Sequence, residues 1–364
     1  MTAKELTGSP TVRDYSLTGP STRRAIQRGL VSGEWYQCPV PRARMKELMK
    51  RRDGPALRDT AIWLGLLGVS GFWMYHFWGS WLAVPGVIVY GVLYGSSGDS
   101  RWHECGHGTA FRTRWMNDVV YQIASFMIVR NPTLWRWSHT RHHTDTYIIG
   151  QDPEIVGMRP PQLMMMLGYF VGITDVPFLF AAMLRHASGR LTADEKTFVP
   201  ESERGKVYWT ARIWVLIYAS VIVACFALGT ILPAMFIGLP AFYGAWLKHI
   251  VATPQHVGLS DDVLDHRLNT RTVYMNPVLR FVYWNMNYHV EHHMFPMVPY
   301  HALPELHEEI RGDCPPAYSG LVAAYREIIP TVVRQLREPE YFVRRPLPLG
   351  LARAEPQVAP TPAD

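Results

Sequence analysis

Three short patches of the sequence hold eight of its 15 histidines. They are His103 and His107 in HECGH, His139, His142 and His143 in HTRHH, and His289, His292 and His293 in HVEHH. Within each patch the histidines are mostly three or four residues apart, so on a helix they share one face. Imidazoles crowded together are costly when protonated, and a bound metal ion removes that cost by taking their lone pairs. The patches therefore predict metal ligation.

The number of histidines indicates more than one metal ion. A zinc site takes three or four protein ligands, so eight imidazoles exceed one such site about twofold. Two ions with four or five nitrogens each fit better. His256 in the run LKHIVATPQHVGL is a ninth candidate, and His249 is a further one whose geometry Pro254 complicates. The remaining histidines have no other histidines at helical spacing and are interpreted as structural or surface residues: His76, His186, His266, His301 and His307.

Carboxylates are expected around such a site. Imidazole is a neutral ligand that suits iron, copper or zinc, so two ions bring positive charge that the ligands leave uncompensated. Nearby acidic side chains would orient the imidazoles and balance that charge. The candidates by position in the sequence are Glu104 and Glu291 inside the patches, Asp145, Asp152 and Glu154 in HTDTYIIGQDPE, and Asp99 just before the first patch.

Two long stretches without Lys, Arg, Asp or Glu must position the patches. One runs for 39 residues between Asp59 and Asp99, and the other for 35 residues between Arg212 and Lys248. A bilayer core needs about 20 apolar residues per helix, so each stretch is long enough for two passes. Glycine and proline near both midpoints indicate turns. We predict two transmembrane helical hairpins, with four spans at about 60–78, 80–98, 213–229 and 231–248.

The charged flanks predict the orientation. Residues 1–58 carry 12 Lys or Arg against five Asp or Glu, whereas the hairpin tips carry no charge. The positive-inside tendency places both termini and everything outside the hairpins in the cytoplasm, so all three patches face one side. Residues 161–184, interrupted by Asp175 and Pro177, are interpreted as an interfacial or re-entrant helix pair, because a fifth span would separate the third patch from the others.

The fold class that follows is an all-α, multi-pass integral membrane protein. A basic cytoplasmic N-terminal arm covers residues 1–58. The membrane catalytic domain covers residues 59–325, where a cytoplasmic helical cap holds a histidine-rich di-metal site. Residues 326–364 are expected to form a C-terminal helix and, from about residue 342, a disordered proline-rich tail.

The order of the patches, HxxxH, HxxHH and HxxHH after two membrane hairpins, resembles the membrane fatty acid desaturase superfamily of non-haem di-iron enzymes. The third patch is the most specific, since NMNYHVEHHMFPMVPYHALPELH is similar to the last histidine box of that family. The likeness covers roughly residues 60–325. Carried over residue by residue, it implies nine iron ligands: His103, His107, His139, His142, His143, His256, His289, His292 and His293. Some members place Asn where Ala252 stands here, which leaves a tenth position open to His249, Asn285, Asn287 or water.

The resemblance implies an oxygen-dependent oxidation of an unactivated C–H bond, with two iron ions and O2 as co-substrate. Desaturation of a fatty acyl or lipid substrate is the leading reaction. Hydroxylation or oxidative demethylation of a lipid or small molecule is the alternative, because the choice depends on substrate placement. HECGH is also a literal HExxH zinc metalloprotease motif, but that interpretation leaves HTRHH and HVEHH without a role. No nucleic-acid partner is expected.

Electrons are expected from a separate protein. The chain shows no haem-binding extension, and four scattered cysteines cannot build an iron–sulfur centre. A ferredoxin, a Rieske-type protein or a cytochrome with its reductase is therefore implied. We hypothesise that an acidic carrier docks on arginines around the first two patches, with anionic lipid headgroups as the alternative contact. These arginines are Arg101, Arg112, Arg114, Arg130, Arg136 and Arg141.

Overall fold

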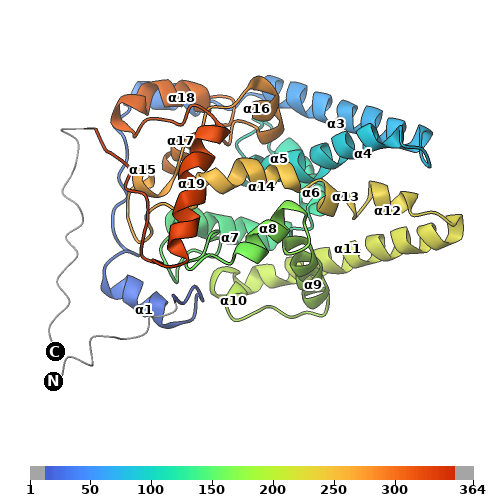
Figure 1. Cartoon of the computed structure of the whole chain (residues 1–364), viewed down its shortest axis with the longest axis horizontal. Helices are drawn as coiled ribbons and strands as arrows, with labels where there is room; N and C mark the ends of the chain where they lie inside the picture. The colour runs from blue at the N-terminus through green and yellow to red at the C-terminus, as the bar shows by residue number, and fades with distance from the viewer. Residues whose placement is uncertain (1–12, 349–364) are drawn as a thin grey trace.

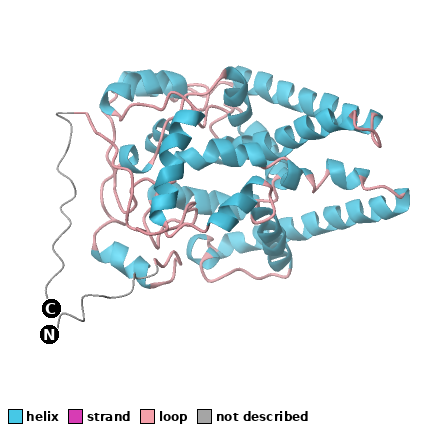
Figure 2. Ribbon diagram, in the orientation of Figure 1, coloured by secondary structure: helices cyan, strands magenta, loops and turns pink. Residues whose placement is uncertain are grey.

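A computed structural model describes residues 13–348 of the chain. Helices are the regular elements of these residues, and they are joined by loops (Figure 2). Two isolated bridges, Thr272 to Tyr288 and Val273 to Tyr318, are the β-type pairings in this part of the chain. The expectation of an all-helical chain is therefore confirmed for the described residues.

Two helical hairpins project side by side from one end of the molecule (Figure 1). The first is formed by α3 (Asp53–His76) and α4 (Ala83–Gly91), and the second begins with α11 (Glu201–Leu228) and returns through α12 (Leu232–Phe236). Gly229 ends α11 in the left-handed conformation, with φ at 61°, which glycine adopts without steric cost.

The returning leg of the first hairpin continues without a break into the first histidine patch. After α4 the chain makes one π-helical turn, Val92–Ser96, and then forms α5 (Ser97–His107). Gly108 follows with φ at 69° and ends the helix directly after the patch. One helical rod thus carries the first patch at its inner end.

The returning leg of the second hairpin is broken, whereas one continuous span at 231–248 was expected. It consists of α12, α13 (Pro240–Tyr243) and α14 (Trp246–Ala252). Gly238 lies between the first two pieces with φ at 100°, a conformation that a helix cannot contain. The prolines and glycines of this stretch therefore interrupt the helix at more points than the single turn expected.

Within the described residues, α11 is the one helix that is long and apolar enough to cross a membrane by itself. The pair α8 (Leu163–Phe170) and α9 (Asp175–Ala187) meets the same criterion jointly and is bent by 86°. This bent pair has the shape expected for a re-entrant segment at 161–184. The other three expected spans remain predictions.

The remaining helices form the body from which the hairpins project (Figure 1). They are α1 (Pro20–Gln27), α2 (Arg42–Leu48), α6 (Arg114–Met127), α7 (Pro132–Thr144), α10 (Glu195–Phe198), α15 (His266–Asn269), α16 (Pro277–Tyr283), α17 (His289–Met294), α18 (Leu303–Ile310) and α19 (Leu321–Gln335). Two 3₁₀ turns lie at Thr253–Gln255 and Arg311–Asp313. The first part of the expected tail, residues 342–348, lies against this body, because the amide of Val343 donates to the carbonyl of Gly258 at 2.9 Å. Residues 349–364 lie outside the described part of the chain.

Arg101 fastens α5 to the body. Its side chain is fully buried, and its guanidinium donates to the carbonyl oxygens of Phe281 at 3.0 Å and Val282 at 2.8 Å. These carbonyls belong to the last turn of α16, where a positive charge is favoured. The rings of Trp63 and Trp284 lie 5.4 and 4.9 Å from the guanidinium carbon. Arg101 is therefore not a docking residue, and that part of the hypothesis is wrong.

The two hairpins meet where their backbones come close together. A Cβ atom added to Gly244 would lie 1.8 Å from the carbonyl oxygen of Gly91 and 2.7 Å from that of Pro240. The serine after Gly95, Ser96, donates to the carbonyl of Gly244 at 2.6 Å. Small residues allow this close approach of two membrane-type helices.

We expect Gly244→Ala to destabilise the protein, because the added methyl group meets backbone atoms that cannot move aside. Such overpacking costs about 1–3 kcal/mol or more. Gly65→Ala is the matched control, because Gly65 lies in α3 and a Cβ there meets no atom within 4 Å. Thermal unfolding in detergent, followed by tryptophan fluorescence, should show a lower midpoint for the first variant and an unchanged or higher midpoint for the second. Equal midpoints would contradict the close contact.

Candidate metal centre

The nine expected ligands come from four places in the chain and converge inside the body. Helix α5 supplies His103 and His107 at its last turn. Helix α7 supplies His139, His142 and His143, α17 supplies His289, His292 and His293, and His256 follows the 3₁₀ turn Thr253–Gln255. All three patches are therefore helical, as their spacing predicts, and their histidines share faces.

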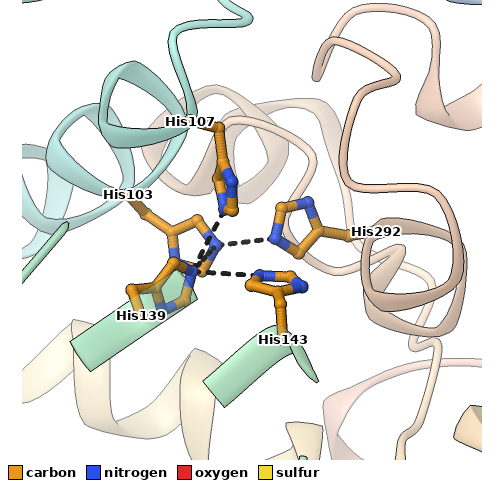
Figure 3. Close-up of side chains that lie close together, drawn as sticks. All are labelled: His103, His107, His139, His143 and His292. Atoms are coloured by element: carbon orange, nitrogen blue, oxygen red, sulfur yellow. Dashed lines mark hydrogen bonds between the residues drawn. The ribbon is translucent and has the colours of Figure 1, made fainter. Parts of the chain in front are cut away.

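Five imidazoles form a first group, which is called the five-histidine group below. The rings of His103, His107, His139, His143 and His292 point toward one another from three helices (Figure 3). Each offers a nitrogen within 4.8 Å of the others. The Nε2 atom of His103 lies 2.8 Å from that of His292 and 3.1 Å from that of His139.

The other four imidazoles form a second group beside it, the four-histidine group. Nitrogens of His142, His256 and His293 lie within 4.8 Å of one another. The Nε2 atom of His289 lies 3.1 Å from those of His256 and His293. The ring centroids of His143 and His293 are 4.4 Å apart, so the two groups are in direct contact.

Two carboxylates set the tautomer of their imidazoles. Glu154 accepts a hydrogen bond from Nδ1 of His139 at 2.8 Å, and Asp152 accepts one from Nδ1 of His142 at 2.8 Å. Glu154 also accepts from the hydroxyl of Ser138 at 2.5 Å. An imidazole whose Nδ1 carries the donated proton leaves a lone pair on Nε2. These two expected carboxylates therefore lie where they can orient ligands.

Neutral acceptors do the same for three other rings. Nδ1 of His256 donates to the carbonyl oxygen of Asn269 at 2.9 Å, and Nδ1 of His293 lies 3.2 Å from the hydroxyl oxygen of Thr146. That hydroxyl donates in turn to the carbonyl of His142, so its lone pairs face His293. The amide nitrogen of Gln255 lies 3.1 Å from Nδ1 of His289, and rotating this amide by 180° puts its oxygen there as the acceptor.

Burial favours the neutral form of eight of the nine imidazoles. It lowers the pKa of His107 to about 4, and burial together with neighbouring imidazoles lowers the pKa of the others in the five-histidine group well below the usual value. The same causes lower the pKa of His256, His289 and His293. His142 is the exception, because burial would lower its pKa but the charge and hydrogen bond of Asp152 outweigh burial and raise it.

The donor set fits metal ions. Neutral imidazoles with Nδ1 bound to an acceptor present unprotonated Nε2 atoms, and two such atoms 3.1 Å apart cannot hydrogen-bond each other. A cation between them removes the repulsion of their lone pairs. Imidazole nitrogens suit iron, copper and zinc, and two groups of five and four nitrogens match the coordination of two such ions.

Four of the six expected carboxylates do not reach an imidazole of the two groups. Glu104 accepts from the hydroxyl of Thr109 at 2.7 Å and the amide of Tyr300 at 3.0 Å, and so braces α5 against the loop before α18. Glu291 accepts from Nδ1 of His307 at 2.5 Å. A side chain next to a ligand in a helix points about 100° away from it, which proximity in sequence does not show.

The other two candidates bind arginines. Asp145 lies 3.6 Å from Arg141, and Asp99 lies 3.8 Å from Arg130. Both carboxylates therefore balance guanidinium charge within the described residues, rather than orient an imidazole. Thr146 and Asn269, which do orient imidazoles, carried no signal in the sequence, because Thr146 lies in the turn after α7 and Asn269 ends the short helix α15.

Two candidates for a tenth position are engaged by other groups. Nε2 of His249 lies 3.2 Å from Asp175, and Asn285 donates to the carbonyl of Tyr300 at 3.0 Å and accepts from Arg280 at 2.8 Å. Asn287 donates to the carbonyl of Val273 at 2.9 Å through Nδ2, whereas its Oδ1 is buried and has no hydrogen-bond partner among the described residues. The tenth position therefore stays a prediction, and the two histidine groups consist of the nine expected residues.

A cavity of about 470 Å³ opens onto both groups. Histidines from each group line it: His103 and His139 from the first, and His142, His256 and His289 from the second. The rest of the lining is mixed. Its apolar side chains include Trp102, Leu134, Trp135, Leu179, Ala182, Met183 and Trp214, and its charged ones are Asp99, Arg130, Glu154 and Glu195. The apolar part of this lining can hold a hydrocarbon chain beside the site.

Fold and donor set together define an all-helical protein with a histidine-rich metal-type site. Residues 79–325 match the family model described as fatty acid desaturase. This match covers well over half of the chain, so the chain belongs to the fatty acid desaturase family.

Named relatives agree with this family at low identity. A fatty acid conjugase of Calendula officinalis is 26% identical over 241 residues, which are 55% of this chain and 60% of that protein. An endoplasmic reticulum acyl-lipid omega-3 desaturase of Arabidopsis thaliana, whose name includes cytochrome b5, is 24% identical over 55% of this chain and 56% of that protein. A chloroplastic sn-2 acyl-lipid omega-3 desaturase of the same plant, whose name includes ferredoxin, is 22% identical over 69% of this chain and 61% of that protein. The chain therefore spans less than two thirds of each of these relatives.

We expect Asp152→Asn to weaken metal binding about 10–100-fold, because the ligand His142 loses the charge that orients it. Asp145→Asn is the matched control, since Asp145 follows the same helix but binds Arg141. Metal content after competition with a graded series of chelator concentrations measures the affinity. Equal retention by the two variants would show that Asp152 does not support the site.

Proposed function

We propose that this protein catalyses the O2-dependent oxidation of an unactivated C–H bond, most directly the desaturation of a fatty acyl chain in a lipid. One observation carries the proposal: nine imidazoles converge in two adjoining groups at the wall of a cavity with many apolar side chains. The nine histidines would hold two iron ions, as the residues fit them. Family membership supports an oxidoreductase of this kind.

The hairpins would place this chemistry at a membrane surface. Only 17% of the most apolar window of α11 is buried, whereas a core helix of a soluble protein is mostly buried. Phe226 of α11 and Phe72 of α3 are 84% and 68% exposed, and such large apolar surfaces belong in lipid. Both hairpins would then cross the bilayer as four spans, with the body and the described termini on the cytoplasmic side.

The bound irons would supply the activation of O2 and the abstraction of hydrogen. The chain's own residues hold the site in a fixed form. Asp152 and Glu154 keep the Nδ1 protons of His142 and His139, so that Nε2 remains a ligand. Trp135 stacks on His139 with a centroid distance of 4.0 Å and so limits the rotation of that ring. Preorganised ligands of this kind lose little free energy to reorganisation during reaction.

The cavity would bind the acyl chain and exclude water. Its apolar walls come from α5, α7, α9 and α11, and histidines of both groups form one side. A saturated chain offers no hydrogen-bonding group, so its position is fixed by shape and by burial of apolar surface. The carbon that lies beside the histidines would be the one oxidised.

The electrons would come from a separate carrier protein. The four cysteines of the chain are free, and their spacing does not form an iron–sulfur motif. The names of two relatives include cytochrome b5 and ferredoxin, both of which carry single electrons. A carrier of this type would therefore reduce the irons before each reaction with O2.

The zinc protease interpretation of HECGH has less support from the geometry. His103 and His107 share their group with three other imidazoles, which a single zinc site does not need. Glu104 would have to act as the general base, but its carboxylate accepts from Thr109 and Tyr300.

We expect the purified protein to bind about two iron ions per chain, because its nine nitrogens form two adjoining groups. His292→Ala should lower the iron content, since His292 belongs to the five-histidine group. His301→Ala is the matched control, because that histidine lies outside both groups. Elemental analysis measures the iron, and mass spectrometry of lipids incubated with the protein, O2 and a reduced carrier measures the products. One zinc ion retained in the variant would refute the proposal, and hydroxylated lipids would favour the alternative reaction.

We expect Ala182→Phe to disfavour long acyl chains, because Ala182 lines the cavity and the larger ring fills part of it. The rate for long acyl chains divided by the rate for short ones should fall by at least about tenfold. In a fitted apolar pocket the binding of one methylene group contributes about 1–3 kcal/mol, and the ring would displace one or more of them. Ala181→Phe is the matched control, because Ala181 lies on the exposed face of the same helix. A ratio that the first variant leaves unchanged would show that the chain lies elsewhere.

A further inference from the structure

A tenth histidine lies beside the four-histidine group. His266, the first residue of α15, is 3% exposed, and its ring centroid lies 5.3 Å from that of His293. It does not belong to the nitrogens that converge within 4.8 Å among the described residues. His266 therefore touches a proposed ligand from outside the site. Its role is not explained by metal binding.

A partly exposed tryptophan covers this histidine. Trp35 stacks flat on His266, with ring centroids 4.2 Å apart and planes 10° from parallel. The indole Nε1 donates to the carbonyl of Thr144 at 2.9 Å, at the end of the helix that carries the second histidine patch. Both the stack and the hydrogen bond fix the orientation of the indole ring. Trp35 is therefore held against the site from the surface side.

The three rings cross the wall of the protein. Trp35 reaches solvent, His266 is buried behind it, and His293 belongs to the four-histidine group. Each ring contacts the next, so no gap interrupts the path from the surface to the site. Electron transfer slows steeply with the distance through which the electron must pass and with gaps in the packing along it. A packed aromatic path of two steps is a short route for an electron.

The segment that contains this tryptophan has an excess of basic residues. Residues 20–52 carry nine Lys or Arg against two Asp or Glu. Arg23, Arg24 and Arg28 lie exposed on and just after α1, with Arg28 paired to Asp262 at 2.6 Å, and Ala25 of the same helix belongs to the small core that Trp35 covers. The chain between α1 and α2 runs along the end of the molecule opposite the hairpin tips (Figure 1). A soluble acidic protein can reach this end, whereas lipid headgroups would lie on the hairpin side.

We propose that Trp35 marks the docking surface of an acidic one-electron carrier protein, and that Trp35 and His266 form the path by which electrons enter the four-histidine group. This inference rests on the proposed function. It replaces the docking surface expected around the first two patches, of which Arg101 is buried and Arg130 faces the cavity. His266 and Trp35 are positioning residues, since neither touches the substrate.

The carrier protein passes electrons to the site one at a time. Each encounter oxidises the reduced carrier by one electron and reduces one ferric ion of the site to ferrous, with no bond formed or broken. Two encounters per turnover supply two electrons. With two protons and the two hydrogens removed from the substrate, these electrons reduce O2 to two molecules of water.

The test measures reduction of the iron-loaded protein in detergent, without substrate. A reduced [2Fe–2S] ferredoxin and the reduced soluble domain of cytochrome b5 are mixed with it in a stopped-flow instrument, and dithionite serves as a small reductant that needs no docking. We expect Trp35→Leu and His266→Ala to slow reduction by the protein carrier several-fold, with iron content unchanged. His266→Phe should keep the fast rate, because it restores a ring at that position.

Two matched controls complete the test. Trp137→Leu removes a tryptophan of α7 that is 39% exposed and stacks on none of the described histidines, and it should leave the rate unchanged. Arg24→Glu should slow association at low salt by about tenfold or more, and the difference should shrink at high salt. An exposed arginine remote from Trp35, Arg112, gives the comparison as Arg112→Glu.

Three outcomes would overturn the inference. Unchanged reduction of Trp35→Leu by the carrier would exclude this entry path. Loss of iron in His266→Phe would make His266 a ligand instead. Failure of both carriers to reduce wild-type protein that dithionite does reduce would exclude docking of this class. A wild-type protein that binds no iron would instead refute the proposed function itself, so the two failures are distinguishable.

Discussion

The structure depends on one constraint: nine imidazoles must lie within a few ångströms of one another without repelling one another as charged groups. Protonation of any pair would place like charges side by side in a buried space, where Coulomb repulsion is poorly screened. Burial prevents this by lowering the pKa of eight of the nine rings, and acceptors at Nδ1 fix which nitrogen keeps its lone pair. Asp152 and Glu154 are the acidic partners of these rings among the described residues. The two histidine groups therefore depend on the body of the protein, which holds the four segments that carry the nine histidines in place.

That body explains why the hairpins and the site form one unit. The rod from α4 to α5 carries the first patch, and Arg101 fixes the rod to the end of α16, which precedes the third patch. Gly244 and Gly91 let the second hairpin lie against this rod. Because the cavity is walled by the same helices, the position of a bound chain and the position of the ligands are set by shared contacts.

The sequence predicted which histidines converge because their spacing is local. Histidines three or four residues apart share a helix face wherever the helix lies, so the patches required no knowledge of tertiary structure. The carboxylates were harder, because Asp152 and Glu154 reach imidazoles through a loop, whereas Glu104 and Glu291 sit among the histidines and point elsewhere.

Tertiary contacts explain the other differences. Arg101 looked like a surface charge, but carbonyl oxygens and indole rings from distant segments surround it. The expected span at 231–248 is divided at Gly238, which adopts a positive φ. The backbone contact of Gly244 with Gly91 involves the other hairpin, so the sequence of this span alone does not show it. Hydropathy averages over such breaks and does not show them.

The π-helical turn at Val92–Ser96 is the place where the helical rod from α4 to α5 can lose one residue and remain a helix. A π turn contains one more residue than an α turn, so the loss of one residue there would restore a regular helix and leave both ends in phase. The loss of one residue after this turn, before His103, would instead rotate His103 and His107 by about 100° away from the rings of α7 and α17. The loss of one residue within the turn can thus be absorbed, while the segment between the turn and the first patch has a fixed length.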